Sequence, residues 1–204
     1  MQAYLDNSAT TRVDAQVQEL MKKLMDVDFG NPSSRHQKGV VAEGYIKEAR
    51  QKIAATLKVD PKELIITSGG TESNNMALIG TALAAKRKGN HIITTAVEHP
   101  SVKATASFLE EQGFRITFLS VDSRGQISLE ELKEALTPDT ILVSIMYVNN
   151  EIGTIQPIEE AAKLVHATAL GAVFHVDAIQ AYGKVLIRPK QQGIDLLSVS
   201  SHKF

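Results

Sequence analysis

Short apolar runs rich in β-branched residues alternate with segments of helical periodicity from residue 60 onward. Each run is bounded by Gly, Pro, Asn or Asp, which is typical of a β-strand. The segments between them carry apolar residues at i, i+3 and i+4 spacing, which predicts helices. Apolar strands joined by helices form a mostly parallel sheet, because right-handed crossovers place the helices on its two faces. The pattern therefore predicts an α/β fold. The predicted strands span residues 64–68, 91–96, 114–120, 140–148, 172–178 and 194–200.

The first 60 residues follow a different pattern. An extended start at residues 3–6 precedes a helical stretch, the polar loop "FGNPSSRHQKG" and a second helical stretch. Residues 1–12 need not belong to the sheet domain and could pack elsewhere.

Composition limits what the chain can bind. The 204 residues are 43% hydrophobic, which is enough to bury a substantial core. Lys and Arg total 22 against 23 Asp and Glu, so we expect no direct nucleic-acid binding and no attraction to anionic lipid. The N-terminus lacks the pattern of a signal peptide, and no apolar run reaches the ~18 residues of a membrane span, so we expect a cytoplasmic protein. The chain has no Cys, which excludes disulfides, thiolate metal sites and a cysteine nucleophile within it, and we expect no metal site.

Chemically unusual residues follow several predicted strands, and the carboxyl ends of such strands are where α/β proteins bind ligands. Gly70 and Thr71 follow the run at 64–68 and open a helix, an arrangement that suits a phosphate. A helix capped by Thr71 after a tight turn would explain them equally well. His99 follows the run at 91–96, where an isolated His is more often structural.

The later strands end in similar groups. Asn149 follows the run at 140–148, although turn formation alone could explain it. Asp177 ends a buried strand, where a carboxylate is costly unless it meets a cation or several donors. Gln180 lies just beyond Asp177, and the last strand leads to Lys203, flanked by Ser200 and His202.

This set of residues matches the needs of pyridoxal 5'-phosphate (PLP). The cofactor requires an amine for a Schiff base, a carboxylate to keep its ring nitrogen protonated, an anion cradle at a helix N-terminus and a flat group over the ring. Lys203, Asp177, Gly70 with Thr71, and His99 fit these roles in that order; Ser200 and His202 could donate to the phosphate, and Gln180 and Asn149 to the phenolic oxygen.

Seven motifs in this chain resemble those of the NifS/IscS-type cysteine desulfurases, in family order and at family spacing. This group is part of the class V branch of fold type I PLP enzymes. The forms "EHP" and "NNEIGT" favour it over the SufS-like group. The motifs are "YLDNSATT" (4–11), "GNPSSRH" (30–36), "TSGGTESNN" (67–75), "TTAVEHPSV" (94–102), "VNNEIGTIQPI" (148–158), "HVDAIQAYGK" (175–184) and "SVSSHK" (198–203).

The resemblance implies a three-layer α/β/α fold with a mostly parallel sheet. Residues 1–12 would belong to a second, smaller α/β domain, and residues 13–204 would form an incomplete PLP-binding large domain. The implied reaction converts L-cysteine to L-alanine and delivers the sulfur to an iron–sulfur scaffold, or to tRNA and cofactor thiolation. Lys203 would bind the cofactor, His99 would stack on it and move protons, Asp177 would pair with the ring nitrogen, Gln180 would contact the phenolic oxygen, Gly70, Thr71, Ser200 and His202 would hold the phosphate, and Asn149 would help to hold the substrate carboxylate.

The chain departs from the family pattern after Lys203. Family members are longer homodimers, and the cysteine that carries the sulfur and the arginine that binds the substrate carboxylate follow the lysine. We therefore expect that a C-terminal half with the catalytic Cys is missing and that this chain alone has no desulfurase activity.

Two other interpretations stay open. Another class V PLP enzyme, such as a selenocysteine lyase, a kynureninase-like hydrolase or an aminotransferase, would share the Asp and Lys. A non-catalytic half-enzyme could serve as a binding module. A nucleotide-binding Rossmann domain is disfavoured because "TSGGTES" is not G-x-G-x-x-G.

Overall fold

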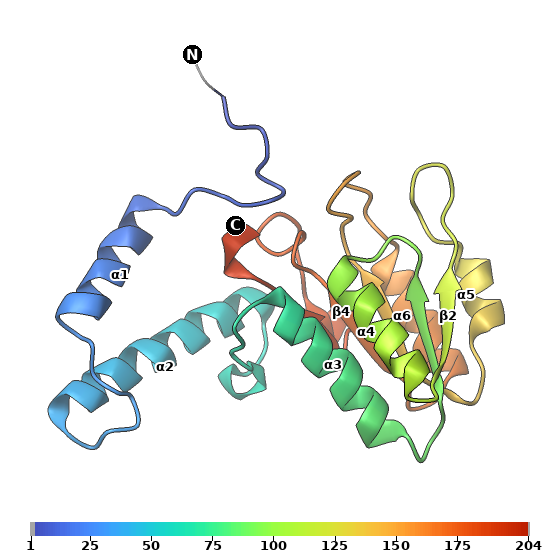
Figure 1. Cartoon of the computed structure of the whole chain (residues 1–204), viewed down its shortest axis with the longest axis horizontal. Coiled ribbons are helices and arrows are strands. Elements are labelled where there is room, and N and C mark those ends of the chain that lie inside the picture. The colour runs from blue at the N-terminus through green and yellow to red at the C-terminus, as the bar shows by residue number, and fades with distance from the viewer. Residues whose placement is uncertain (1–2, 204) are drawn as a thin grey trace. The chain divides into compact units, whose positions relative to one another are not determined.

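The computed structural model describes residues 3–203, which form two compact units. The sheet unit comprises residues 3–9 and 67–203, and the helical unit comprises residues 10–66. Figure 1 shows the elements of each unit.

A five-stranded parallel sheet lies at the centre of the sheet unit. Its strand order is β2-β1-β3-β4-β5, so the chain runs from β1 outward to β2 and then crosses back to β3. The direction of the strand order reverses between β1 and β3, and ligands of open α/β sheets bind at such a reversal. The strands are β1 (His91–Thr95), β2 (Arg115–Leu119), β3 (Thr140–Met146), β4 (Val173–Asp177) and β5 (Leu196–Ser198).

Helices cover the sheet in two groups. Helix α3 packs against α4, and α5 packs against α6. In Figure 1 the α3 and α4 pair lies in front of the sheet and α6 lies behind it. The helices of this unit are α3 (Gly70–Ala85), α4 (Pro100–Glu111), α5 (Leu129–Ala135), α6 (Ile158–Thr168), α7 (Pro189–Gln192) and the 3₁₀-helix η2 (Ser201–Lys203).

Apolar side chains from the helices and strands meet in the core between α3, α4 and the sheet. Leu78 of α3, Ile92 of β1 and Leu109 of α4 are members of one buried cluster. Strands β1 and β3 are buried along their whole length, as expected for parallel strands covered on both faces. This packing therefore fixes the carboxyl ends of the strands, where ligands of such sheets bind.

The helical unit contains α1 (Ala15–Asp26), α2 (Gln37–Leu57) and the 3₁₀-helix η1 (Pro61–Glu63). Asp14 caps α1 by accepting a hydrogen bond from a backbone N–H. Helix α2 is followed by its C-cap residue Lys58, which adopts a left-handed conformation. None of the residues of α1 is buried.

The structure confirms the predicted α/β fold with a parallel sheet and overturns one predicted strand. Residues 64–67 form no strand, and Ile65 and Ile66 are 71% and 62% exposed. A strand needs a neighbour to pair its backbone groups, and no strand of residues 3–203 pairs with this segment. The proposed division into a small domain (1–12) and a large domain (13–204) stays a prediction. No helix within the described residues combines the length and the apolar character needed to cross a membrane.

Candidate functional site

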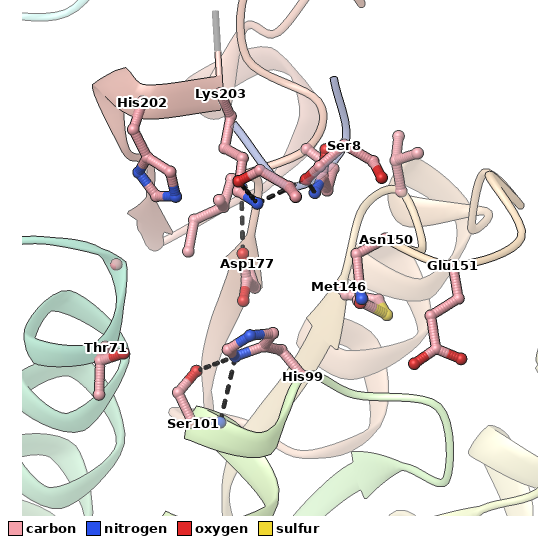
Figure 2. A pocket seen from close by; sticks show the side chains of 15 residues that line it. Ser8, Thr71, His99, Ser101, Met146, Asn150, Glu151, Asp177, His202 and Lys203 are labelled. Carbon is pink, nitrogen blue, oxygen red and sulfur yellow. Dashed lines mark hydrogen bonds between the residues drawn. The ribbon is translucent and has the colours of Figure 1, made fainter. Parts of the chain in front are cut away.

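A cavity of about 440 Å³ lies at the carboxyl ends of the strands of the sheet unit. Figure 2 shows side chains from several segments converging on it. The cavity brings together seven of the nine residues that the sequence predicted for the site. These are Gly70, Thr71, His99, Asp177, Gln180, His202 and Lys203.

Asp177 is the last residue of β4 and is 4% exposed. Its Oδ1 accepts a hydrogen bond from the Ile179 backbone N–H at 3.0 Å, and its Oδ2 accepts one from Asn74 Nδ2 at 2.8 Å. Burial raises the pKa of this carboxyl, and the two hydrogen bonds act in the opposite direction. Because both donors are neutral, a cation in the cavity would stabilise the ionised form.

His99 caps the N-terminus of α4, and Pro100 follows it at the first helical position. Its Nδ1 accepts a hydrogen bond from the Ser101 backbone N–H at 3.2 Å and lies 2.8 Å from Ser101 Oγ. His99 therefore both caps a helix and lines the cavity. The Nδ1 edge holds the helix start, and the ring lines the cavity (Figure 2).

Lys203 is held by the N-terminal segment of the same unit. Its Nζ donates hydrogen bonds to the backbone oxygens of Ser8 and Ala9, the latter at 2.6 Å. Gln180 Nε2 donates to the same Ser8 oxygen at 2.8 Å. The amine and the Gln180 amide thus share one acceptor at the edge of the cavity, and Figure 2 shows Lys203 beside Ser8.

The N-terminus of α3 supplies backbone groups to the cavity. Helix α3 begins at Gly70, so Thr71 lies in the first turn and is not the cap; Gly69 is the cap residue and makes no side-chain capping bond. A Cβ on Gly70 would collide with the side chain of Ile179. The sequence therefore needs glycine at this position for close packing, and the 16-residue helix presents a positive end.

Two predicted residues do not line the cavity. Asn149 is buried, and its Oδ1 accepts from the backbone N–H groups of Glu151 and Ile152, while its Nδ2 donates to the Val97 backbone oxygen. It organises the loop after β3. Ser200 is also buried, with its Oγ 2.8 Å from His202 Nδ1.

The sequence analysis missed several residues of the lining. Asn150 and Glu151 belong to the motif "VNNEIGTIQPI", but the sequence does not distinguish a turn-forming residue such as Asn149 from its neighbours that line the cavity. Ser8 and Ala9 belong to the recognised motif at 4–11, but nothing in the sequence indicated that their backbone oxygens meet Lys203, which is 195 residues from Ser8. The missed lining residues are Ser8, Ala9, Ser101, Met146, Val148, Asn150, Glu151 and Ile179.

Glu98, beside His99, is a further unusual residue near the site. It is 3% exposed, and its Oε1 accepts hydrogen bonds from Thr95 Oγ1 and the Met146 backbone N–H, both at 2.8 Å. Its Oε2 is buried and has no partner among the described residues. Burial raises the pKa of Glu98 to about 8, and the nearby Asp177 carboxylate adds to the shift.

Comparisons with known proteins agree with this geometry. The family described as aminotransferase class-V matches residues 3–204. A protein named cysteine desulfurase IscS from Dictyoglomus turgidum is 49% identical over all of this chain and 51% of its own length. A putative cysteine desulfurase IscS 1 from Bacillus subtilis is 50% identical over 98% of this chain and 52% of its own length. The chain thus spans about half the length of these curated relatives.

Solved structures give the same result. A NifS-like protein superposes with a TM-score of 0.97 at 42% identity, over all of this chain and 56% of that protein. A structure of SspA in complex with cysteine superposes with a TM-score of 0.94 at 40% identity, over 99% of this chain and 58% of that protein. These matches confirm the resemblance to NifS/IscS-type proteins. The chain belongs to the aminotransferase class-V family.

Proposed function

We propose that this chain forms the PLP site of a cysteine desulfurase, an enzyme that converts L-cysteine to L-alanine and passes the sulfur on. The observation that carries the proposal is the cavity shared by Lys203, Asp177 and His99 at the carboxyl ends of the sheet. Similar proteins of known sequence are named cysteine desulfurases, and one similar solved structure is a complex with cysteine.

The residues of the cavity fit PLP. The buried Asp177 carboxyl has only neutral hydrogen-bond donors, and a protonated pyridine nitrogen would supply the cation that it lacks. The start of α3 has no side-chain cap, and Gly70 leaves no Cβ between the backbone and a ligand. A phosphate at such a helix start is stabilised by backbone N–H groups.

Each residue then has a role. Asp177 would keep a proton on the ring nitrogen, and bound PLP would supply an electron sink for the substrate. Lys203 would provide the amine that holds the cofactor and carries a proton at Nζ. His99 would cover the ring, and Gln180 Nε2 would donate to the phenolic oxygen. Gly70, Thr71 and His202 would hold the phosphate, and Ser200 would support them through its contact with His202. Asn149 would help to hold the substrate carboxylate through the loop that it organises.

The sulfur acceptor and the assembly are further parts of the proposal. The chain has no Cys, so we propose that the cysteine which takes up the sulfur lies in the part of the relatives that this chain does not match. We propose a cytoplasmic homodimer that delivers sulfur to an iron–sulfur scaffold or another sulfur-acceptor protein. The names of the curated relatives support the desulfurase part of this proposal.

The proposal predicts that the protein binds PLP through Asp177 and Lys203. Titration with PLP should produce the visible absorbance of a lysine-bound cofactor, and Lys203→Ala should abolish it. Asp177→Asn keeps the shape but removes the charge, so it should weaken binding about tenfold or more, because hydrogen bonds to charged groups are the stronger ones. The exposed Asp122→Asn serves as a matched control and should bind PLP normally.

Product analysis completes the test. We expect no alanine from L-cysteine with the 204-residue chain alone. Once a polypeptide that supplies the cysteine is present, we expect alanine and a persulfide on that cysteine, from which an added thiol reductant releases sulfide. Robust alanine formation by the chain alone would contradict the proposal that a cysteine outside this chain takes up the sulfur. Binding of PLP without any reaction of cysteine, even when the cysteine-bearing polypeptide is present, would favour another class V enzyme.

A further inference from the structure

A buried amide connects Asp177 and His99, two residues that line the cavity. Asn74 lies in α3 and is fully buried. Its Nδ2 donates hydrogen bonds to Asp177 Oδ2 at 2.8 Å and to Ser101 Oγ at 3.0 Å. Ser101 Oγ lies 2.8 Å from His99 Nδ1. A continuous hydrogen-bonded path therefore runs from Asp177 through Asn74 and Ser101 to His99.

The direction of each hydrogen bond in this path follows from its chemistry. A carboxylate accepts hydrogen bonds, so Asn74 must turn its Nδ2 and not its Oδ1 toward Asp177. The second hydrogen of Nδ2 then goes to Ser101 Oγ. The Oδ1 of Asn74 is left buried and without a partner among the described residues. Such an atom is costly, and the cost is tolerated because the reverse orientation would place two acceptors together.

The path also determines where His99 carries its hydrogen. Because Ser101 Oγ accepts from Asn74, its own hydrogen is free to donate to His99 Nδ1. The Ser101 backbone N–H points to the same nitrogen at 3.2 Å. With two donors directed at it, Nδ1 must be the unprotonated nitrogen of a neutral imidazole, and the hydrogen lies on Nε2.

We propose that Asn74 and Ser101 are positioning residues that fix the tautomer of His99 and tie it to the Asp177 carboxylate. Neither residue is assigned a part in the proposed reaction above. The consequence for catalysis rests on the proposed function, since His99 would then offer Nε2–H, and not an acceptor, to a molecule in the cavity. The tautomer itself does not depend on that function.

The tautomer can be measured without cofactor or substrate. In the protein labelled with ¹⁵N at histidine, two-bond ¹H–¹⁵N correlation spectra separate protonated from unprotonated ring nitrogens. His99→Gln identifies the His99 signals by their loss. We expect the neutral ring of His99 to carry its hydrogen on Nε2.

Two variants interrupt the hydrogen-bonded path between Asp177 and His99, one at Ser101 and one at Asn74. Ser101→Ala deletes the hydroxyl donor to Nδ1 and keeps the backbone N–H. Asn74→Leu leaves the hydroxyl in place but frees it to accept a hydrogen from Nδ1. Each should shift the tautomer ratio of His99 toward Nδ1–H by about three- to tenfold, the size expected for one hydrogen bond.

The matched control is Thr105→Val. Thr105 is another buried residue of α4, and its hydroxyl lies within hydrogen-bond distance of the Ser101 backbone oxygen and of the Asn75 side chain, not of His99. It should leave the tautomer ratio unchanged. Amide spectra of every variant show whether it is folded, and Ser101→Ala, which loses a single oxygen atom, covers the case in which Asn74→Leu does not fold.

The outcomes separate this inference from the proposed function. Hydrogen on Nδ1 in the unaltered protein would overturn the inference. An unchanged ratio in Ser101→Ala would also overturn it, because the backbone N–H alone would then fix the ring. Failure to bind PLP would contradict the proposed function but would not change the conclusion about which nitrogen of His99 carries the hydrogen.

Discussion

At the scale of single residues, the site depends on carboxyl groups that the fold removes from water. Asp177 has two neutral donors, whereas Glu98 has hydrogen bonds only to Oε1. Both carboxyl pKa values are raised by burial. With a pKa of about 8, the Glu98 carboxyl favours its protonated form at neutral pH.

Glu98 makes a pH-dependent contribution to stability. Its pKa rises from 4.5 to about 8 on folding, so the folded protein binds the extra proton. This contribution is complete below pH 4.5 and is lost as the pH rises through about 8. Glu98→Gln stays neutral, so its unfolding free energy relative to the unaltered protein should increase between about pH 5 and about pH 9. Urea unfolding at both pH values measures this; a constant difference would mean that Glu98 is ionised in the fold.

At the scale of elements, one buried histidine joins three strands to a helix. His175 of β4 is fully buried, with Nδ1 2.8 Å from Ser144 Oγ of β3 and Nε2 3.0 Å from Ser198 Oγ of β5. Ser73 of α3 donates to Ser198 Oγ at 2.8 Å. Burial lowers the pKa of His175 to about 3. The network thus fixes the start of α3 relative to β4, which ends at Asp177, and to β5, which precedes the 3₁₀-helix with Lys203.

Removing one hydroxyl of this network should be costly. Ser198→Ala leaves Nε2 of the buried His175 without its partner, which should lower the unfolding free energy by about 1–3 kcal/mol. The exposed Ser123→Ala should change it by less than about 0.5 kcal/mol. Chemical denaturation of both variants at neutral pH gives the comparison. Equal stabilities would show that the network does not hold the strands together.

The start of α3 offers a second test at this scale. Gly70→Ala places a Cβ against Ile179 Cδ1, so we expect a loss of about 1–3 kcal/mol in stability together with weaker PLP binding. Ile179→Val removes that Cδ1 and should restore much of the loss in the double variant. Gly69→Ala, where a Cβ would meet nothing within 4 Å, should be mild. If the double variant remains as impaired as Gly70→Ala, the steric explanation is wrong.

At the scale of the whole molecule, the sequence predicted the five strands of the sheet and one strand that does not form. Five of the six predicted strands form: β1 and β3 are buried along their whole length, and β2, β4 and β5 each pair with a neighbouring strand of the parallel sheet. The segment at 64–68 has an equally apolar sequence, but a strand also requires a pairing partner, which sequence periodicity does not reveal.

The site was predictable where the chemistry is unusual and local. A carboxylate at the end of a buried strand and a lysine after the next strand pointed to Asp177 and Lys203. Asn74 and Glu98 were missed because their meaning lies in long-range contacts, such as Asn74 to Asp177, 103 residues apart. The same limit explains why Ser8 was not foreseen, since its backbone oxygen meets Lys203 across 195 residues.

The most direct test of the account is to locate the lysine that holds PLP. The protein is incubated with PLP, reduced with borohydride to fix the cofactor to its amine, digested and analysed by mass spectrometry. The account predicts the label on Lys203, with none on Lys184, whose Nζ donates to the backbone oxygen of Lys203 at 2.9 Å. A label on Lys184 or another lysine, or no label at all, would contradict it.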